Sequence, residues 1–156
     1  MREVERICDQ LERALHGNAW HGPSVMEVLA GVSPTAAAAK PLASAHSIWE
    51  IVNHIAAWER IARERILEWN IRKVSDEEDW PPVVEASESA WSSALEALKQ
   101  TNSELRETIK SLDDSRLEET IGDQSQTAYY LLHGVVQHDL YHAGQIALLK
   151  KAFAAA

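Results

Sequence analysis

Apolar residues recur every three or four positions along four long stretches of the chain, with polar residues between them. This spacing is typical of amphipathic helices, whereas the strict alternation of half-buried strands is missing from the sequence. The first predicted helix runs from about Glu3 to Leu15 and is ended by Gly17 and Asn18. Its apolar face consists of Val4, Ile7, Cys8, Leu11, Ala14 and Leu15.

The second predicted helix begins at Ser47 and extends to about Lys73. Glu50 stands three residues after Ser47, the spacing of a capping box, in which each side chain accepts a hydrogen bond from the other residue's backbone amide. An acidic loop from Ser75 to Asp79, followed by two prolines, ends this helix.

Two further long helices are predicted, from about Glu85 to Leu112 and from about Gln126 to Phe153. The apolar face of the last helix includes Tyr130, Leu131, Val135, Ile146 and Leu149. The segment 18–46 is irregular because it is interrupted by glycines and prolines, although Ser24 could cap a short turn within it. Residues 113–124 form a polar connection.

Four long helices without strands predict a four-helix bundle, and the length of the chain fits a single domain over residues 1–156. The link between the second and third long helices has about eleven residues, which span about 35 Å when extended. That length approaches the roughly 40 Å of the second helix, so a crossover that leaves the two helices parallel is possible. A simple up-down-up-down meander would need less loop.

Charge and composition exclude several classes of function. Lys and Arg number 15 against 24 Asp and Glu, which gives a net charge of −9 that repels phosphate backbones, so nucleic acid is not expected as a partner. The single cysteine cannot form an intrachain disulfide, which favours a reducing compartment. The charged start of the chain lacks a secretory apolar run, and no stretch approaches the roughly 20 apolar residues that span a bilayer. We therefore expect a cytoplasmic protein without a membrane partner.

His138 and His142 carry the strongest chemical signal. They stand four positions apart on the last predicted helix, which places them about 40° from each other on one face. Leu131, Val135 and Leu149 share this stripe, so both imidazoles face the core and need polar partners there. A metal ion is one such partner. On their own, however, two histidines at this spacing are more often a satisfied core residue and an edge residue.

His54 on the second helix changes this balance. It shares a stripe with Ile51 and Trp58 and therefore also points inward. Three inward histidines from two helices match the three-ligand plan of catalytic metal sites, in which a fourth position stays open. The sequence thus predicts that His54, His138 and His142 bind a divalent metal ion. Neutral imidazoles suit Zn, Ni, Fe or Cu, and such an ion can acidify a water or hold a thiolate.

Other polar residues near the predicted ligands have two interpretations each. Asp139 and Glu50 either accept hydrogen bonds from ligand N–H groups or are solvated charges. Gln145 lies one turn beyond His142 and either reaches the site or ties two helices together. The remaining histidines are assigned to solvent, loop or cap positions, with a pocket wall as the alternative for His46; they are His16, His21, His46 and His133. The tryptophans at helical spacing are assigned to packing, namely Trp49, Trp58 and Trp91.

Two stretches of the sequence resemble a known family. His46 through His54 to Trp58, and the run from His138 to Ile146, are similar to the motifs of the DinB-like, or YfiT-like, metalloenzyme superfamily, which is unrelated to the DNA polymerase of the same name. The stretch from Trp20 to Ser24 is similar to one branch of the family. Together these stretches extend the resemblance over nearly the whole chain.

The resemblance implies a four-helix bundle with an up-down-down-up course, with a crossover between the second and third long helices, and a homodimer. It also implies that His54, His138 and His142 are the metal triad. Characterised members include thiol-dependent S-transferases that use bacillithiol or mycothiol and a thiol-dependent maleylpyruvate isomerase, and others are classed as metal-dependent hydrolases. No motif in this sequence selects one thiol or one substrate.

Three functions follow from these observations. The first is a metal-dependent transferase or hydrolase, in which a Zn, Ni or Fe ion activates water or a low-molecular-weight thiol for a small-molecule substrate. The second is a non-catalytic metal- or ligand-binding bundle, which the lack of an obvious general base on the ligand stripe favours. The third is a structural helical dimer whose histidines are core polar groups.

Overall fold

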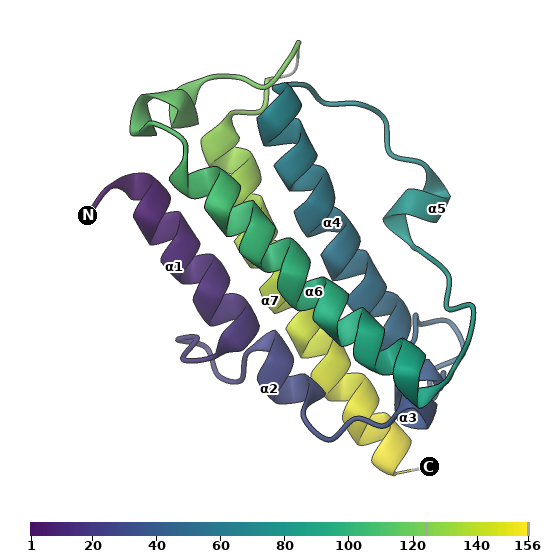
Figure 1. The fold of residues 1–156 in the computed structure, drawn as a ribbon. Coiled ribbons are helices and arrows are strands. Elements are labelled where there is room, and N and C mark those ends of the chain that lie inside the picture. Colours follow the sequence, from purple (N-terminus) through teal and green to yellow (C-terminus); the bar gives the residue numbers. More distant parts are fainter. Residues whose placement is uncertain (124, 156) are drawn as a thin grey trace.

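The computed structural model describes residues 1–123 and 125–155, and its regular elements are helices (Figure 1). Four of them are long, namely α1 (Glu3–His16), α4 (Ile48–Glu68), α6 (Glu88–Lys110) and α7 (Ala128–Ala154). Short helices occupy the connections: α2 (Val25–Leu29), α3 (Pro34–Ala38), α5 (Asp76–Asp79) and the 3-10 helix η1 (Asp114–Glu118). Over the described residues the only β-pairing is an isolated bridge, Thr120 to Thr127, so the prediction of an all-helical fold is confirmed.

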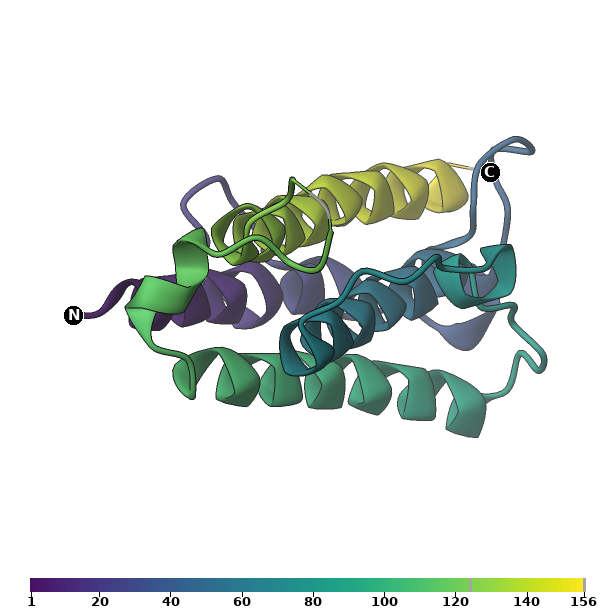
Figure 2. The same ribbon diagram turned by 90° about the horizontal axis from the view of Figure 1, so that it is seen from above.

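The four long helices lie along a common direction, and α4 and α1 each contact both α6 and α7 (Figure 2). Figure 1 shows α4 and α6 running in one direction and α1 and α7 running in the other. Because α4 and α6 are parallel, the chain must return from the end of α4 to its beginning before it enters α6. It does so through residues 69–87, which pass beside α4 and include α5. None of the described helices is long and apolar enough to cross a membrane.

Several helix ends differ from the predicted positions. α4 stops at Glu68 and not near Lys73, because Trp69 adopts a left-handed conformation (φ 49°) and its indole Nε1 donates to the backbone oxygen of Thr120 at 3.1 Å. The predicted acidic loop at 75–79 is a short helix, α5, capped by Ser75. α6 and α7 start two to three residues later than predicted, at caps formed by Ser87 and Thr127. The end of the polar connection at residue 124 lies outside the described residues.

The start of α4 is held by the predicted capping box. Ser47 Oγ accepts from the Glu50 amide at 3.1 Å, and Glu50 Oε2 accepts from the Ser47 amide at 2.7 Å. Ser47 is almost fully buried, so this cap is shielded from solvent. The cap fixes where the helix begins and thereby the direction in which His54, two turns later, projects.

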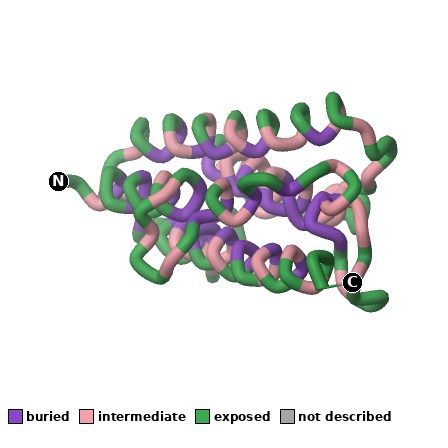
Figure 3. The backbone as a smooth tube through the Cα atoms, turned by 90° about the horizontal axis from the view of Figure 1, so that it is seen from below, coloured by how far each residue is buried: buried purple, intermediate pink, exposed green. Residues whose placement is uncertain are grey.

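The core consists of two apolar clusters that face inward from the helices (Figure 3). One cluster joins α1 to the C-terminal halves of α4 and α6 and to the N-terminal half of α7. The other joins α2 and α3 to the opposite halves of α4, α6 and α7. A buried polar layer lies at the level where the two meet, made by Glu59 on α4, Asn102 on α6 and Asp139 on α7. The predicted apolar face of α7 is wrong at Tyr130, which is 68% exposed.

Removing the cap of α4 tests its contribution to the fold. We expect Ser47→Ala to lower the free energy of unfolding by about 1 kcal/mol, because two buried backbone amides lose their partners or their alignment. Ser75→Ala, which removes the matching capping box from the short exposed α5, is the control and should cost less than about 0.5 kcal/mol. Denaturant unfolding of both variants makes the measurement; equal losses would contradict the argument.

Candidate metal centre

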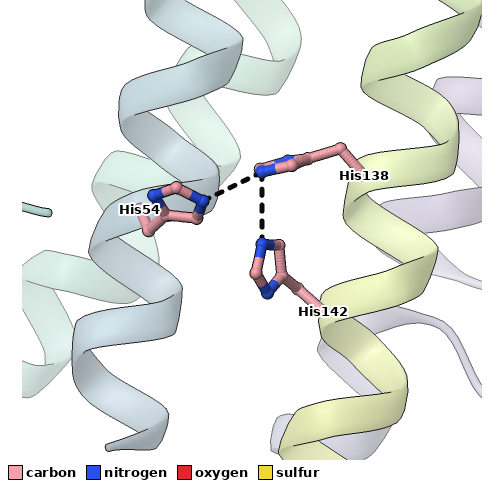
Figure 4. Close-up of side chains that lie close together, drawn as sticks. All are labelled: His54, His138 and His142. Atoms are coloured by element: carbon pink, nitrogen blue, oxygen red, sulfur yellow. Dashed lines mark hydrogen bonds between the residues drawn. The ribbon is translucent and has the colours of Figure 1, made fainter. Parts of the chain in front are cut away.

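The three predicted histidines come together between the middle of α4 and the middle of α7, with their rings directed toward one another (Figure 4). His138 Nε2 lies 3.0 Å from His54 Nε2 and 3.2 Å from His142 Nε2. His54 and His142 are buried, and His138 retains 25% of its side-chain exposure. Antiparallel packing of α4 and α7 accounts for the meeting, since it sets the part of α4 that carries His54 beside the middle of α7.

In two of the rings the other nitrogen, Nδ1, is hydrogen-bonded to an oxygen that can only accept. His54 Nδ1 lies 2.6 Å from the backbone oxygen of Asp79, and His142 Nδ1 lies 2.6 Å from Gln145 Oε1. A carbonyl oxygen can only accept, so each of these Nδ1 atoms carries the hydrogen. The neutral ring then has a bare lone pair at Nε2.

The third ring, that of His138, turns its Nδ1 toward the carboxyl of Asp139, with Oδ1 at 3.7 Å. This distance is too long for a hydrogen bond, and within the described residues His138 Nδ1 has no hydrogen-bond partner. In the metal-free protein the proton of this ring can therefore lie on Nε2 and be donated to Nε2 of His54 or His142. With that proton on Nδ1 instead, all three Nε2 lone pairs face one another. The arrangement with three facing lone pairs is stabilised by a positive charge between the nitrogens.

Protonation of the rings does not supply this charge near neutral pH. Burial lowers the pKa of His138 to about 4. Burial, together with the neighbouring His138, lowers the pKa of His142 to about 4 as well. Burial also lowers the pKa of His54, against the opposing effect of the Asp79 backbone oxygen. All three side chains are therefore neutral at pH 7, the form in which imidazole binds metal ions.

The spacing of the nitrogens fits a small divalent cation. Tetrahedral nitrogen ligands at about 2.0–2.1 Å from a zinc ion stand roughly 3.3 Å apart. The separations of 3.0 and 3.2 Å are slightly shorter, and small rotations of the imidazoles would open them to that value. Three neutral donors on one side leave the remaining coordination positions free on the other.

The free side of the triad opens into a cavity of about 660 Å³. Its walls come from α4, from α7, from the loop before α4 and from the crossover segment at α5. Besides the triad, its lining includes Leu42, Ser44, Ala45, Trp80, Tyr141 and Leu148. This volume falls in the range of small-molecule sites, so the triad has access to a ligand.

The crossover segment contributes two residues that hold the site together. Asp79 Oδ1 accepts from the indole Nε1 of Trp58 at 2.6 Å, in addition to the hydrogen bond between the Asp79 backbone oxygen and His54. Trp80 stacks flat on the His54 ring at 3.8 Å between centroids, and His46 stacks on Trp80 at 3.5 Å. The hydrogen bond to Asp79 therefore fixes which way the His54 ring points, and the stacking of Trp80 fixes the plane of the ring.

A comparison with protein-family models finds a match to the DinB superfamily over residues 19–146. The chain belongs to the DinB superfamily. Neither the curated proteins nor the solved structures gave a match. The match includes all three histidines of the triad as well as Asp79 and Trp80.

In this DinB-superfamily protein the predicted supporting residues have distinct positions. Gln145 reaches the site, which was one of its two interpretations, since its side-chain oxygen accepts a hydrogen bond from His142. Glu50 caps α4 and pairs with Lys40 at 2.9 Å, so it acts on the helix end and not on a ligand N–H group. Asp139 lies beside His138 but is fully buried, which excludes a solvated charge.

Asp139 forms a buried pair with Glu59, a residue that sequence reasoning missed. Glu59 accepts from Thr101 Oγ1 at 2.8 Å and from Asn102 Nδ2 at 2.6 Å. Burial raises the pKa of Glu59 and of Asp139 well above the ordinary range, and the nearby Asp139 raises that of Glu59 further. A proton held on this pair would satisfy the carboxyl of Asp139, which otherwise has no hydrogen-bond partner among the described residues.

Some of the other tryptophans and histidines pack in the core or lie at the surface, and others line the cavity. Trp49 and Trp91 pack in the core, as predicted, whereas Trp58 lines the cavity. His46 also lines it, which agrees with the pocket-wall alternative. His16 and His21 are exposed, and His133 contacts Tyr129 and lies 3.9 Å from Glu3.

The lowered pKa of His138 predicts how the stability of metal-free protein depends on pH. The folded state resists protonation down to about pH 4, while the unfolded chain binds a proton near pH 6.5, so this histidine contributes stability above pH 6.5 that is lost as the pH falls toward 4. His138→Gln removes the contribution. As the pH falls from 7 to 4.5 with a chelator present, we expect the free energy of unfolding to fall less in the variant than in the original chain. The difference between the two losses should exceed about 1 kcal/mol. Parallel pH curves in denaturant unfolding would contradict this.

Proposed function

We propose that the chain is a metal-dependent enzyme in which His54, His138 and His142 hold one divalent ion, Zn, Ni or Fe, at the base of the cavity. The proposed reaction is a thiol-dependent S-transfer or a hydrolysis of a small-molecule substrate. In this proposal the helices form the up-down-down-up four-helix bundle of the DinB superfamily, with residues 69–87 as its crossover, over a single domain of residues 1–156. The location in the cytoplasm and the homodimer remain predictions, the latter testable by molecular mass in solution.

The observation that carries the proposal is the convergence of three Nε2 atoms at the wall of an open cavity. Acceptors at Asp79 and Gln145 direct two of the lone pairs toward a common point, which is how metal-ligating histidines are oriented in proteins. In a purely structural role the His138 Nε2–H group could donate to only one of the other two rings, which leaves the remaining Nε2 lone pair without a donor. The membership of the DinB superfamily supports the same conclusion.

The residues around the triad have separable roles in this proposal. When bound, a divalent ion supplies Lewis acidity at the cavity base. Trp80 and Trp58 shield His54 from solvent, and Asp79 holds both Trp58 and His54 in place. Tyr141, 65% exposed, brings a hydroxyl group to the cavity wall, where it can donate to or accept from a substrate.

A second candidate function, a non-catalytic metal-binding bundle, is favoured by one feature of the cavity. Asp79 is the one carboxylate among the described lining residues, and it is already engaged by Trp58. His46, the remaining histidine in the lining, is stacked on Trp80. A free general base next to the triad is therefore not evident in the described part of the chain.

Metal analysis of protein purified without an affinity tag tests the ion site. We expect close to one equivalent of divalent metal per chain, with His54→Ala, His138→Ala and His142→Ala each lowering the metal affinity at least 100-fold, because two imidazoles hold the ion far less tightly than three. His21→Ala, an exposed loop histidine, is the control and should keep its metal. A chain that is metal-free as purified and refuses added zinc and nickel would refute the proposal.

Turnover by the metal-loaded protein separates the two candidates. One panel supplies thiols with electrophiles and the other supplies esters and amides. We expect turnover in one panel, reduced at least 100-fold in His138→Ala, which lacks a ligand to the ion. A fully loaded protein that is inactive across both panels would favour the non-catalytic bundle.

A further inference from the structure

The cavity above the triad has walls that carry almost no charge. Apart from the histidines, its lining is mainly aliphatic and aromatic: Leu42, Ala45, Ile51, Trp58, Trp80, Tyr141, Leu148 and Leu149. Ser44, Gln145 and Asp79 add polar groups, but Gln145 and Asp79 are already bonded within the site. No Lys or Arg occurs among the described residues that line it.

Three cations close to these walls along the chain are committed elsewhere. Lys40, just before the loop that forms one wall, pairs with Glu50 at 2.9 Å. Lys150, next to Leu149 on α7, donates to the backbone oxygens of Val28 and Ala30 at 3.0 and 2.6 Å. The guanidinium of Arg65 lies over the Trp58 ring, 5.2 Å from its centroid, and belongs to the separate cavity of about 480 Å³ beside Tyr129 and Tyr130.

We propose that this cavity takes a mainly apolar molecule that is uncharged apart from at most one anionic donor atom, which is directed at the ion; this inference rests on the proposed function, because it names the substrate class of the same site. A second carboxylate, phosphate or sulfonate on the molecule would lose its water against apolar walls with no cation to replace it. It would also meet the carboxylate of Asp79. A cationic group would be repelled by the ion itself.

Two dyes with the same skeleton test the charge preference directly. N-phenyl-1-naphthylamine is neutral, whereas 8-anilinonaphthalene-1-sulfonate carries one sulfonate, and both fluoresce strongly only in an apolar environment. In zinc-free protein, where the sulfonate meets no ion, we expect the neutral dye to bind the full chain at least tenfold more tightly than the sulfonate. Ala45→Trp, which places an indole in the cavity wall, should weaken binding of the neutral dye and so locate it.

A matched pair of variants tests whether the sulfonate binds weakly because the cavity wall has no cation. Leu148→Lys puts an ammonium group at the cavity wall, and Leu67→Lys puts one on α4 at a position outside the lining, where the leucine is similarly exposed (60% against 65%). We expect Leu148→Lys to tighten binding of the sulfonate at least fivefold and to change binding of the neutral dye less than twofold. Leu67→Lys, with the same change in net charge, should alter neither dye by more than twofold.

The outcomes distinguish this inference from the proposed function. Equal or tighter binding of the sulfonate to the zinc-free original chain, no binding of either dye, or equal effects of the two lysines would overturn the inference even if the protein binds zinc. Failure to bind zinc would overturn the proposed function, while a preference for the neutral dye would still show that the cavity selects uncharged molecules.

Discussion

Three uncharged imidazoles with their Nε2 atoms directed at one point are the arrangement on which the rest of the site depends. Burial keeps the rings neutral, and the carbonyl oxygens of Asp79 and Gln145 hold the protons of two rings on the far nitrogens. Each acceptor must therefore stay within hydrogen-bonding distance for the lone pairs to remain available. This requirement links α4, α7 and the crossover segment into one unit.

The same region is where the two apolar clusters of the core meet. Glu59, Asn102 and Asp139 place polar groups at that level in three helices, and a shift of α6 by one turn would separate Asn102 from Glu59. Buried polar groups tolerate such a shift poorly because an unpaired partner loses its hydration without compensation. We infer that this layer fixes the relative heights of α4, α6 and α7, and with them the meeting of His54 with the α7 histidines.

Much of this arrangement could be predicted from the sequence because it depends on helix period and capping. The inward positions of His54, His138 and His142 follow from the residues that share their stripes, and the start of α4 follows from Ser47 and Glu50. The end of α4 could not be predicted, since it is set by a bond from Trp69 to a residue 51 positions away. Asp79 escaped notice because its backbone oxygen, which any residue could supply, holds His54.

Because α4 and α6 are parallel, one wall of the site is built by the segment that connects them. A chain that turned back directly after α4 would have no segment passing the histidines, whereas residues 69–87 travel the length of that helix and deliver Asp79 and Trp80 to it. No residue of this segment is fully buried, and near the site it packs against the core through Trp80 and Val83. Insertions or replacements there can therefore alter selectivity while the helices continue to fold as before, so that scaffold and recognition can evolve separately.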